Sequence, residues 1–149
     1  CDESYPITEG LDEADTPEKR LRCFIMNLMR LNFPEDQTQA RQSKLFWLEL
    51  ANPSLALEPL VERFMRPIKE LLETVVQDIA GPLDPETLRL CAGSIASQSL
   101  FHAQNTAVIT QLYPAAAYDP QDVERLAEHI FLFSLAGLKA VRDAARRVP

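Results

Sequence analysis

The feature that most limits the fold of this chain is a capping residue followed by proline, which occurs three times. The three pairs are Thr16-Pro17, Asp84-Pro85 and Asp119-Pro120. A Thr or Asp side chain accepts hydrogen bonds from the unpaired N–H groups of a first helical turn, and proline fits the first helical position because its missing N–H is not needed there. Apolar residues then follow with the period of a helix, and no Gly-Gly, Asn-Gly or Asp-Gly pair indicates a β-hairpin. The sequence therefore predicts an all-α fold.

We expect five to six helices packed as an orthogonal bundle, because five segments keep a helical period. The segments are about 16–33, 37–51, 57–80, 84–112 and 119–147. The buried stripe of the first segment is expected to consist of Leu21, Phe24, Ile25, Leu28 and Leu31, with Met29 beside it. Pro67 lies inside the third segment, where proline removes a backbone donor and clashes with the carbonyl group four residues before it. The expected result is a kink at Pro67 rather than a division into two helices.

Acidic residues are concentrated at the start of the chain. Residues 1–15 hold six Asp or Glu and no Lys or Arg, so we expect an acidic, solvated and weakly ordered leader. Residues 16–149 are nearly neutral and long enough for one folded domain. Neither part has the clustered basic residues that bind DNA or an anionic membrane. No apolar run approaches the about 18 residues that cross a bilayer, and no signal peptide is evident. Since the chain opens on Cys rather than Met, we expect a processed or excised piece of something longer.

The residues that carry catalytic or metal chemistry are few and poorly spaced for it. Three cysteines, Cys1, Cys23 and Cys91, lack CxxC spacing, which favours reduced cytosolic thiols over disulfides or a zinc site. His102 and His129 lie on different segments without a third metal ligand at helical spacing. No glycine-rich phosphate loop and no local signature of a Cys-His nucleophile occurs. We expect neither an enzyme nor a bound metal or cofactor.

One face of the segment 84–112 mixes polar with apolar side chains. Ser94, Gln98, His102 and Asn105 recur every three or four residues and fall within an arc of about 80°. If this polar stripe is turned into the domain, each of its groups costs free energy unless it is hydrogen-bonded. Two explanations remain open: the side chains bond to one another, to backbone carbonyls or to water, or they line a small-molecule cavity with apolar walls. In the second case the walls would be supplied by Phe24, Met29, Trp47, Phe64, Met65, Ile68, Phe101 and Phe133.

The last two segments carry small residues that allow close packing of helices. Alanines lie opposite the polar stripe, and residues 129–138 are apolar almost all the way round. A helix that is apolar on every side has to be covered on every side. A second copy of the chain would cover it, with the last two helices of each subunit forming a four-helix interface; the alternative is that both are core helices of a monomer. The expected dimer interface consists of Ala92, Ala96, Ala103, Ala107, Phe131, Leu135, Ala136, Ala140 and Ala144.

The order of these features resembles the C-terminal, ligand-binding and dimerisation domain of TetR-family transcriptional regulators. The resemblance rests on the stretches TPEKRLRCFIMNLMRLNF, RQSKLFWLELANPSLALEPLVERFMRPIKELLETVV, SQSLFHAQNTAVITQLYP and VERLAEHIFLFSLAGLKAVR. It covers most of residues 16–147. None of the stretches is a strict motif.

The resemblance implies a function that the residues alone do not show. Members of this family are mostly bacterial, cytoplasmic repressors that form homodimers through their last two helices and bind a small organic effector in each C-terminal domain. Effector binding moves the paired helix-turn-helix heads off their operator DNA. That head is absent here, so residues 16–149 are expected to be the effector-binding and dimerisation domain, with DNA contacted only through a domain outside this chain. Gln98, His102 and Asn105, with Ser94, would face a neutral or weakly polar effector. The alternative is a helical adaptor domain with no small-molecule pocket.

Overall fold

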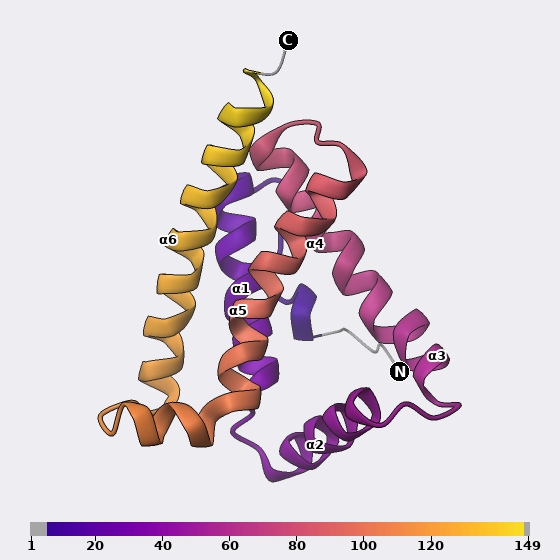
Figure 1. The fold of residues 1–149 in the computed structure, drawn as a ribbon, viewed down its shortest axis with the longest axis vertical. Helices are drawn as coiled ribbons and strands as arrows, with labels where there is room; N and C mark the ends of the chain where they lie inside the picture. Colours follow the sequence, from indigo (N-terminus) through magenta and orange to yellow (C-terminus); the bar gives the residue numbers. More distant parts are fainter. Residues whose placement is uncertain (1–5, 148–149) are drawn as a thin grey trace.

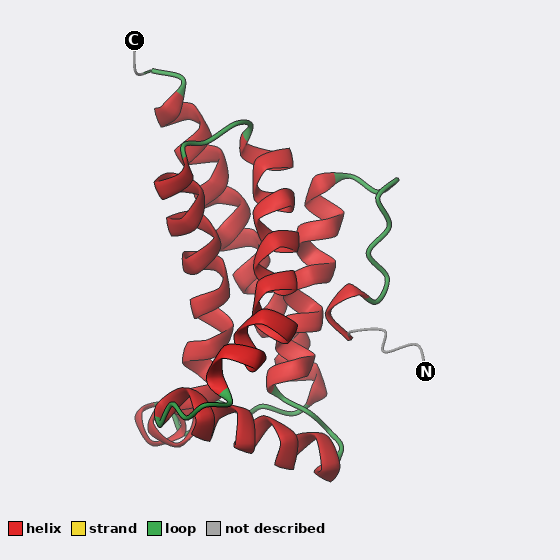
Figure 2. Cartoon of the chain, turned by 90° about the vertical axis from the view of Figure 1, so that its right-hand side faces the viewer, coloured by secondary structure: helices red, strands yellow, loops and turns green. Residues whose placement is uncertain are grey.

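Residues 6–147 are described by the computed structural model, and this part of the chain folds into helices without a strand (Figure 1 and Figure 2). The helices are η1 (Pro6–Thr8), α1 (Pro17–Asn32), α2 (Gln37–Ala51), α3 (Leu57–Leu60), η2 (Val61–Met65), α4 (Arg66–Ala80), α5 (Pro85–Leu112) and α6 (Pro120–Ala145). The all-α prediction is confirmed, and α3, η2 and α4 follow one another directly within the expected third segment. No helix of residues 6–147 is both long and apolar enough to cross a membrane.

All three predicted capping residues begin helices as expected. Thr16, Asp84 and Asp119 each accept a hydrogen bond from backbone N–H groups in the first turns of α1, α5 and α6. Asp36, which the sequence reading did not single out, caps α2 in the same way by accepting from two backbone N–H groups. Each cap satisfies donors that the helix itself leaves unpaired.

Four long helices pack together and the fifth crosses them. α1, α4, α5 and α6 lie side by side, while α2 runs across their lower end (Figure 1). α1 occupies the middle of the group, and Leu21, Phe24, Ile25 and Met29 on it have no exposed surface. Leu31 was expected in the same stripe but is 40% exposed. By contrast, no residue of α2 is fully buried.

Pro67 is accommodated by a π-helix rather than by a break. The π-helix η2 lies directly before α4, and the Arg66 N–H bonds to the Val61 carbonyl, five residues back. A π turn is wider than an α turn. The wider turn is located where the proline ring would otherwise meet the carbonyl group four residues before it. The helical path therefore continues from Leu57 to Ala80 without dividing, as expected.

The described part of the leader, residues 6–15, is mostly exposed but contacts the core at one residue. Ile7 is only 2% exposed and joins the core beside α1. The buried Asn27 side chain on α1 donates to the carbonyls of Ile7 at 3.0 Å and of Glu9 at 2.8 Å. One apolar side chain and one amide therefore hold this segment against α1, despite its acidic composition. Residues 1–5 of the leader lie outside the described residues.

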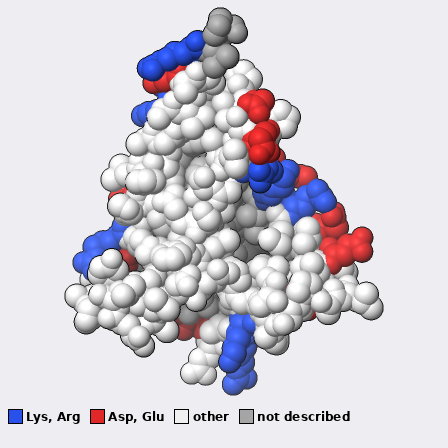
Figure 3. All heavy atoms as spheres, in the orientation of Figure 1, with Lys and Arg blue, Asp and Glu red and all other residues white. Residues whose placement is uncertain are grey.

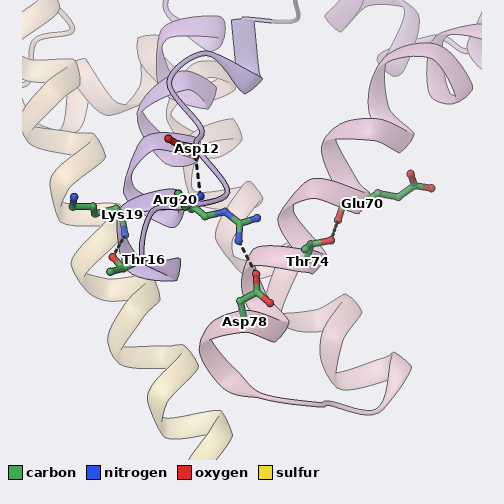
Figure 4. A network of polar contacts seen from close by, with 8 residues as sticks. Asp12, Thr16, Lys19, Arg20, Glu70, Thr74 and Asp78 are labelled. Atoms are coloured by element: carbon green, nitrogen blue, oxygen red, sulfur yellow. Dashed lines mark hydrogen bonds and ion pairs between the residues drawn. The ribbon is translucent and has the colours of Figure 1, made fainter.

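Charged groups tie α1 to the helices on either side of it. Arg20 donates to Asp78 on α4 at 2.7 Å, and the Arg20 side chain is only 13% exposed (Figure 4). Arg22 pairs with Glu128 on α6 and lies over the Phe131 ring, 4.1 Å from its centroid. A guanidinium that is both paired and stacked stabilises a contact more than an exposed pair does.

Candidate functional site

The polar stripe of α5 is turned toward α6 and is paired within the chain. The Gln98 side-chain amide donates to the Ser134 hydroxyl on α6 at 3.0 Å and to the Ser94 carbonyl at 3.2 Å. His102 Nδ1 lies 3.1 Å from the Tyr118 hydroxyl, and Asn105 donates to the Phe101 carbonyl at 2.8 Å. Ser94 is exposed. Gln98, His102 and Asn105 thus have partners within the chain, namely backbone carbonyls of α5, the Ser134 hydroxyl and the Tyr118 hydroxyl, and none of these bonds joins one side chain of the stripe to another.

Asn105 marks an irregular turn within α5. Its backbone angles, φ −116° and ψ 18°, are not helical. The Asn105, Thr106 and Thr110 side chains all bond to carbonyl groups four residues before them. Such bonds compete with the helical ladder and bend helices. The helix is therefore bent just beyond His102, toward the loop that joins it to α6.

His102 also connects α5 to the end of α1 through that loop. Tyr118 bonds to His102 and stacks on Phe33, with ring centroids 4.8 Å apart and planes 5° from parallel. Burial lowers the pKa of His102, and the neighbouring His129 lowers it further. Burial also raises the pKa of the Tyr118 hydroxyl. Both groups are therefore held neutral near physiological pH.

The free energy of unfolding is expected to fall as the pH is lowered from about 7 to about 5, partly because of His102. The folded state lowers the pKa of His102 below its ordinary value of 6.5, so the unfolded chain takes up a proton more readily in this range. His102→Gln keeps a hydrogen-bonding side chain without a titrating group and should flatten the dependence. Urea denaturation followed by circular dichroism at each pH measures the slope.

The exposed His129→Gln is the control for this experiment. It should keep most of the wild-type slope, because burial is a larger cause of the His102 shift than His129 is. The prediction would be contradicted if the free energy of unfolding changed with pH equally steeply in the wild type and in His102→Gln.

The residues expected to wall a cavity are not brought together. Phe24 and Met29 are fully buried in the core, and the half-buried Ile68 packs against it. Phe64 and Met65 are partly exposed on η2, whereas Phe101 and Phe133 are more than half exposed on α5 and α6. Only Trp47 lines one of the two hollows described below. The structure thus divides the predicted wall residues among the core, η2, the exposed sides of α5 and α6, and one groove.

A groove of about 470 Å³ lies between α2 and the middle of α5. Its lining consists of Trp47, Leu50, Ala51, Ala103 and Gln104. The sequence reading missed Leu50, Ala51 and Gln104, and it assigned Ala103 to a dimer interface. The spacing of 47, 50 and 51 along α2, one face of a helix, was the available signal. No lining side chain carries a charge, so the groove suits an uncharged molecule.

A smaller cleft of about 260 Å³ lies between the end of α1 and the start of α6. Its lining includes Arg30, Phe33, Tyr118 and Glu124. Arg30 and Glu124 face each other across it at 3.9 Å. Because this cleft carries charges of both signs that partly offset one another, it gives a less definite indication of a ligand than the groove does.

Large apolar side chains are exposed on the sides of α5 and α6 that face away from the core. This outer face consists of Leu90, Phe101, Val108, Leu132 and Phe133, each more than half exposed. Residues 90–118 contain no Asp, Glu, Lys or Arg. Figure 3 shows the same feature, since charged side chains are confined to the margins of that view. Exposed apolar surface of this kind marks interaction sites in soluble proteins.

The outer face only partly coincides with the predicted dimer interface. Ala92 and Phe131 are buried inside the single chain, while Ala96 and Leu135 are half-buried and pack against the core. Ala103 lines the groove, whereas Ala107, Ala136, Ala140 and Ala144 are exposed. Ala92 and Phe131 point inward and are covered within the single chain, so they do not belong to the outer face.

The thiols and carboxylates of this part of the chain form no other evident site. Burial raises the pKa of the Cys23 and Cys91 thiols, which disfavours the reactive thiolate. Cys1 lies outside the described residues. Within residues 6–147, no three His, Cys, Asp or Glu side chains are grouped so that they could hold a metal ion. That the chain is no enzyme remains a prediction.

The part of the sequence that forms the groove and the outer face matches one known protein family. The sequence model of the C-terminal domain of the HTH-type transcriptional dual regulator CecR matches residues 17–138. The chain belongs to this family. The match begins at the first residue of α1 and ends within α6, so the matched residues include the groove and the whole outer face. No curated protein matches the chain significantly. The expectation of a transcriptional regulator's C-terminal domain is confirmed.

Proposed function

We propose that this chain is the regulatory domain of a TetR-like, bacterial transcriptional repressor. It forms a homodimer through the outer face and binds a small organic effector. Effector binding controls DNA contact by a helix-turn-helix head outside the chain. The membership in the CecR C-terminal domain family supports this assignment, because the family is the C-terminal part of a helix-turn-helix regulator. The small net charge of residues 16–149 agrees with this assignment, because contact with DNA requires a basic surface.

The observation that carries the proposal is the outer face. Phe101 on α5 is 56% exposed and Phe133 on α6 is 66% exposed, beside three exposed aliphatic side chains. Two copies related by a two-fold axis would bury this face in a four-helix interface and remove it from water. Aromatic residues and a lack of charge are typical of the centres of such interfaces. The exposed Ala136 and Ala140 on α6 allow two helices to approach closely.

The groove between α2 and α5 is the effector site that the structure supports best. It has apolar walls with one amide, Gln104, and a volume in the range of small-molecule sites. α2 packs against the other helices through half-buried side chains only. It can therefore move more easily than the other long helices. The polar stripe is a weaker choice, because Gln98, His102 and Asn105 already have partners.

Sedimentation velocity of the chain across the micromolar range tests the proposal. A dimer is expected at the highest concentrations, because association removes several large apolar side chains from water. A monomer at the highest concentration would contradict dimerisation through the outer face.

A helical adaptor domain is the second candidate function. The internal pairing of the polar stripe favours it, since paired side chains do not call for a ligand. An adaptor would leave the groove unoccupied by small molecules. Titration of the Trp47 fluorescence with small uncharged aromatic molecules distinguishes the two functions, since only an effector site in the groove would bind them.

A further inference from the structure

The two histidines of the chain lie near one another where α5 meets α6. His102 is half-buried on α5, and His129 is exposed on α6. Burial is the larger cause of the lowered pKa of His102, and the charge of the neighbouring His129 is the second. His102 already has a partner, the Tyr118 hydroxyl, whereas His129 makes no hydrogen bond or ion pair within residues 6–147. His129 is therefore the imidazole that a second copy of the chain can still cover.

His129 belongs to the side of α6 that the proposed homodimer covers. It begins a stripe with Phe133, Ala136 and Ala140, which follow at steps of four, three and four residues and are all exposed. The rings of His129 and Phe133 have centroids 6.2 Å apart and planes tilted by 33°. An interface of standard size covers about 800 Å² of each partner, which is far more than one ring. A second copy that covers Phe133 therefore covers His129 as well.

The surfaces around His129 offer no free carboxylate that would pair with a positive charge. Residues 90–118 on and after α5 and residues 129–138 of α6 contain no Asp, Glu, Lys or Arg. The charged side chains close to His129 along α6, with their partner on α1, are already joined in ion pairs, which are Glu128–Arg22 and Asp122–Arg125. A charged imidazole covered by such surfaces would lose its hydration without gaining a partner.

Proton uptake by His102 is not tied to association in the same way. His102 faces His129 of α6 and the Tyr118 hydroxyl of the loop before α6. The charged side chains that line the cleft beside Tyr118 are Arg30, Glu35 and Glu124. All these groups belong to the single chain, and only a group whose proton binding changes on association makes association depend on pH. The pH dependence of unfolding expected from His102 is accordingly measured at protein concentrations below the dissociation constant of the dimer.

We propose that His129 makes the homodimer sensitive to pH, so that proton uptake by its imidazole separates the two copies. This inference rests on the proposed dimerisation through the outer face. The neutral imidazole packs beside Phe133 within the interface, whereas the imidazolium is excluded from it because it has no partner there. A two-fold axis doubles the effect, since each interface holds two copies of His129. The dimer thus forms at neutral pH and dissociates on acidification.

The net charge of the chain has the opposite effect on association. The chain carries a net charge of −7 at pH 7, and its isoelectric point is about 4.8. Two copies therefore repel one another less as the pH falls from neutral toward that value. Net charge alone would strengthen the dimer on acidification, so a weaker dimer at low pH identifies a titrating group within the interface.

Sedimentation equilibrium at about pH 7.5 and about pH 5.5, at one ionic strength, tests the proposal, because histidine takes up its proton between these values. Burial commonly weakens proton binding by an imidazole about tenfold, so two copies of His129 should raise the dissociation constant by about ten- to a hundredfold at the lower pH. His129→Gln should remove most of this increase. His102→Gln is the matched control and should keep it. Circular dichroism at the lower pH shows whether the separated copies remain helical.

A permanently charged variant tests the same proposal without acid. His129→Arg carries a positive charge at every pH and should weaken the dimer already at about pH 7.5, where acid does not affect the fold. An arginine variant that is as dimeric as the wild type would contradict the proposal.

The outcomes separate this inference from the function on which it rests. A wild type that is monomeric at about pH 7.5 and at the highest concentration overturns both. If the wild type is a dimer with the same dissociation constant at both pH values, or if His129→Gln dissociates on acidification as strongly as the wild type, the role of His129 is overturned and dimerisation stands. A loss of the pH dependence in His129→Gln but not in His102→Gln supports both.

Discussion

Truncation of Phe24 to alanine is expected to lower the free energy of unfolding by about 3–5 kcal/mol. Phe24 has no exposed surface and lies on α1, which contacts α4, α5 and α6 at once. Removal of its ring leaves a cavity that three helices would have to close together. A domain of this size is stabilised by about 5–15 kcal/mol in total, so the variant should unfold at a much lower urea concentration. Urea denaturation followed by circular dichroism measures the loss.

Phe64→Ala is the matched comparison, since the sequence placed both rings in the walls of one cavity. Phe64 is 41% exposed on η2, and its truncation should cost only about 1 kcal/mol. If Phe24→Ala cost no more than Phe64→Ala, Phe24 would border open space, as the sequence reading supposed, and its place in the core would be wrong.

The ends of the helices were predictable because they depend on local chemistry. Thr16, Asp84 and Asp119 each needed only the next three residues to act as caps, and proline after each cap fixed the first turn. The irregularity at Pro67 followed from the missing N–H in the same way, although the sequence did not indicate that a π-helix would absorb it. Local rules therefore gave the all-α class and the helix bounds.

The orientation of α5 was not predictable, because both of its sides are apolar. Ile95 and Ile109 point into the core, yet Phe101 and Val108 on the opposite side are just as hydrophobic. The helical period of the apolar residues identifies the face of a helix that is turned inward only when the opposite face is polar. The uncharged stretch 90–118 lacks that contrast, so the sequence did not show which side of α5 meets α6.

The packing of the leader and the burial of Ser99 depend on contacts between residues that are distant in the sequence. Six acidic residues predicted a solvated leader, but Asn27 on α1 binds its backbone and Ile7 enters the core. Nothing near Ser99 in the sequence shows that its hydroxyl would lack a partner, since the same helix carries exposed serines at 94 and 97. Such features arise from how the helices meet, which the local pattern of residues does not specify.

Substitution of Phe133 by glutamate is expected to weaken the proposed homodimer by more than about a hundredfold. Phe133 is 66% exposed in the single chain, so the carboxylate is tolerated in the monomer. In a two-fold interface the substitution occurs twice, and each carboxylate would be buried opposite an apolar surface without a partner. Sedimentation equilibrium of the wild type and the variant measures the change in dissociation constant.

Leu45→Glu is the control that tests whether the effect belongs to the outer face. Leu45 is 67% exposed on α2 and belongs neither to the outer face nor to the lining of the groove, so the substitution adds the same charge to an equally exposed apolar position. It should leave the dimer intact, and circular dichroism should show both variants fully helical. If Phe133→Glu remained as dimeric as Leu45→Glu, the chain would associate through another surface or not through apolar contacts at all, because no interface centred on Phe133 can bury two unpaired carboxylates without a large loss of affinity.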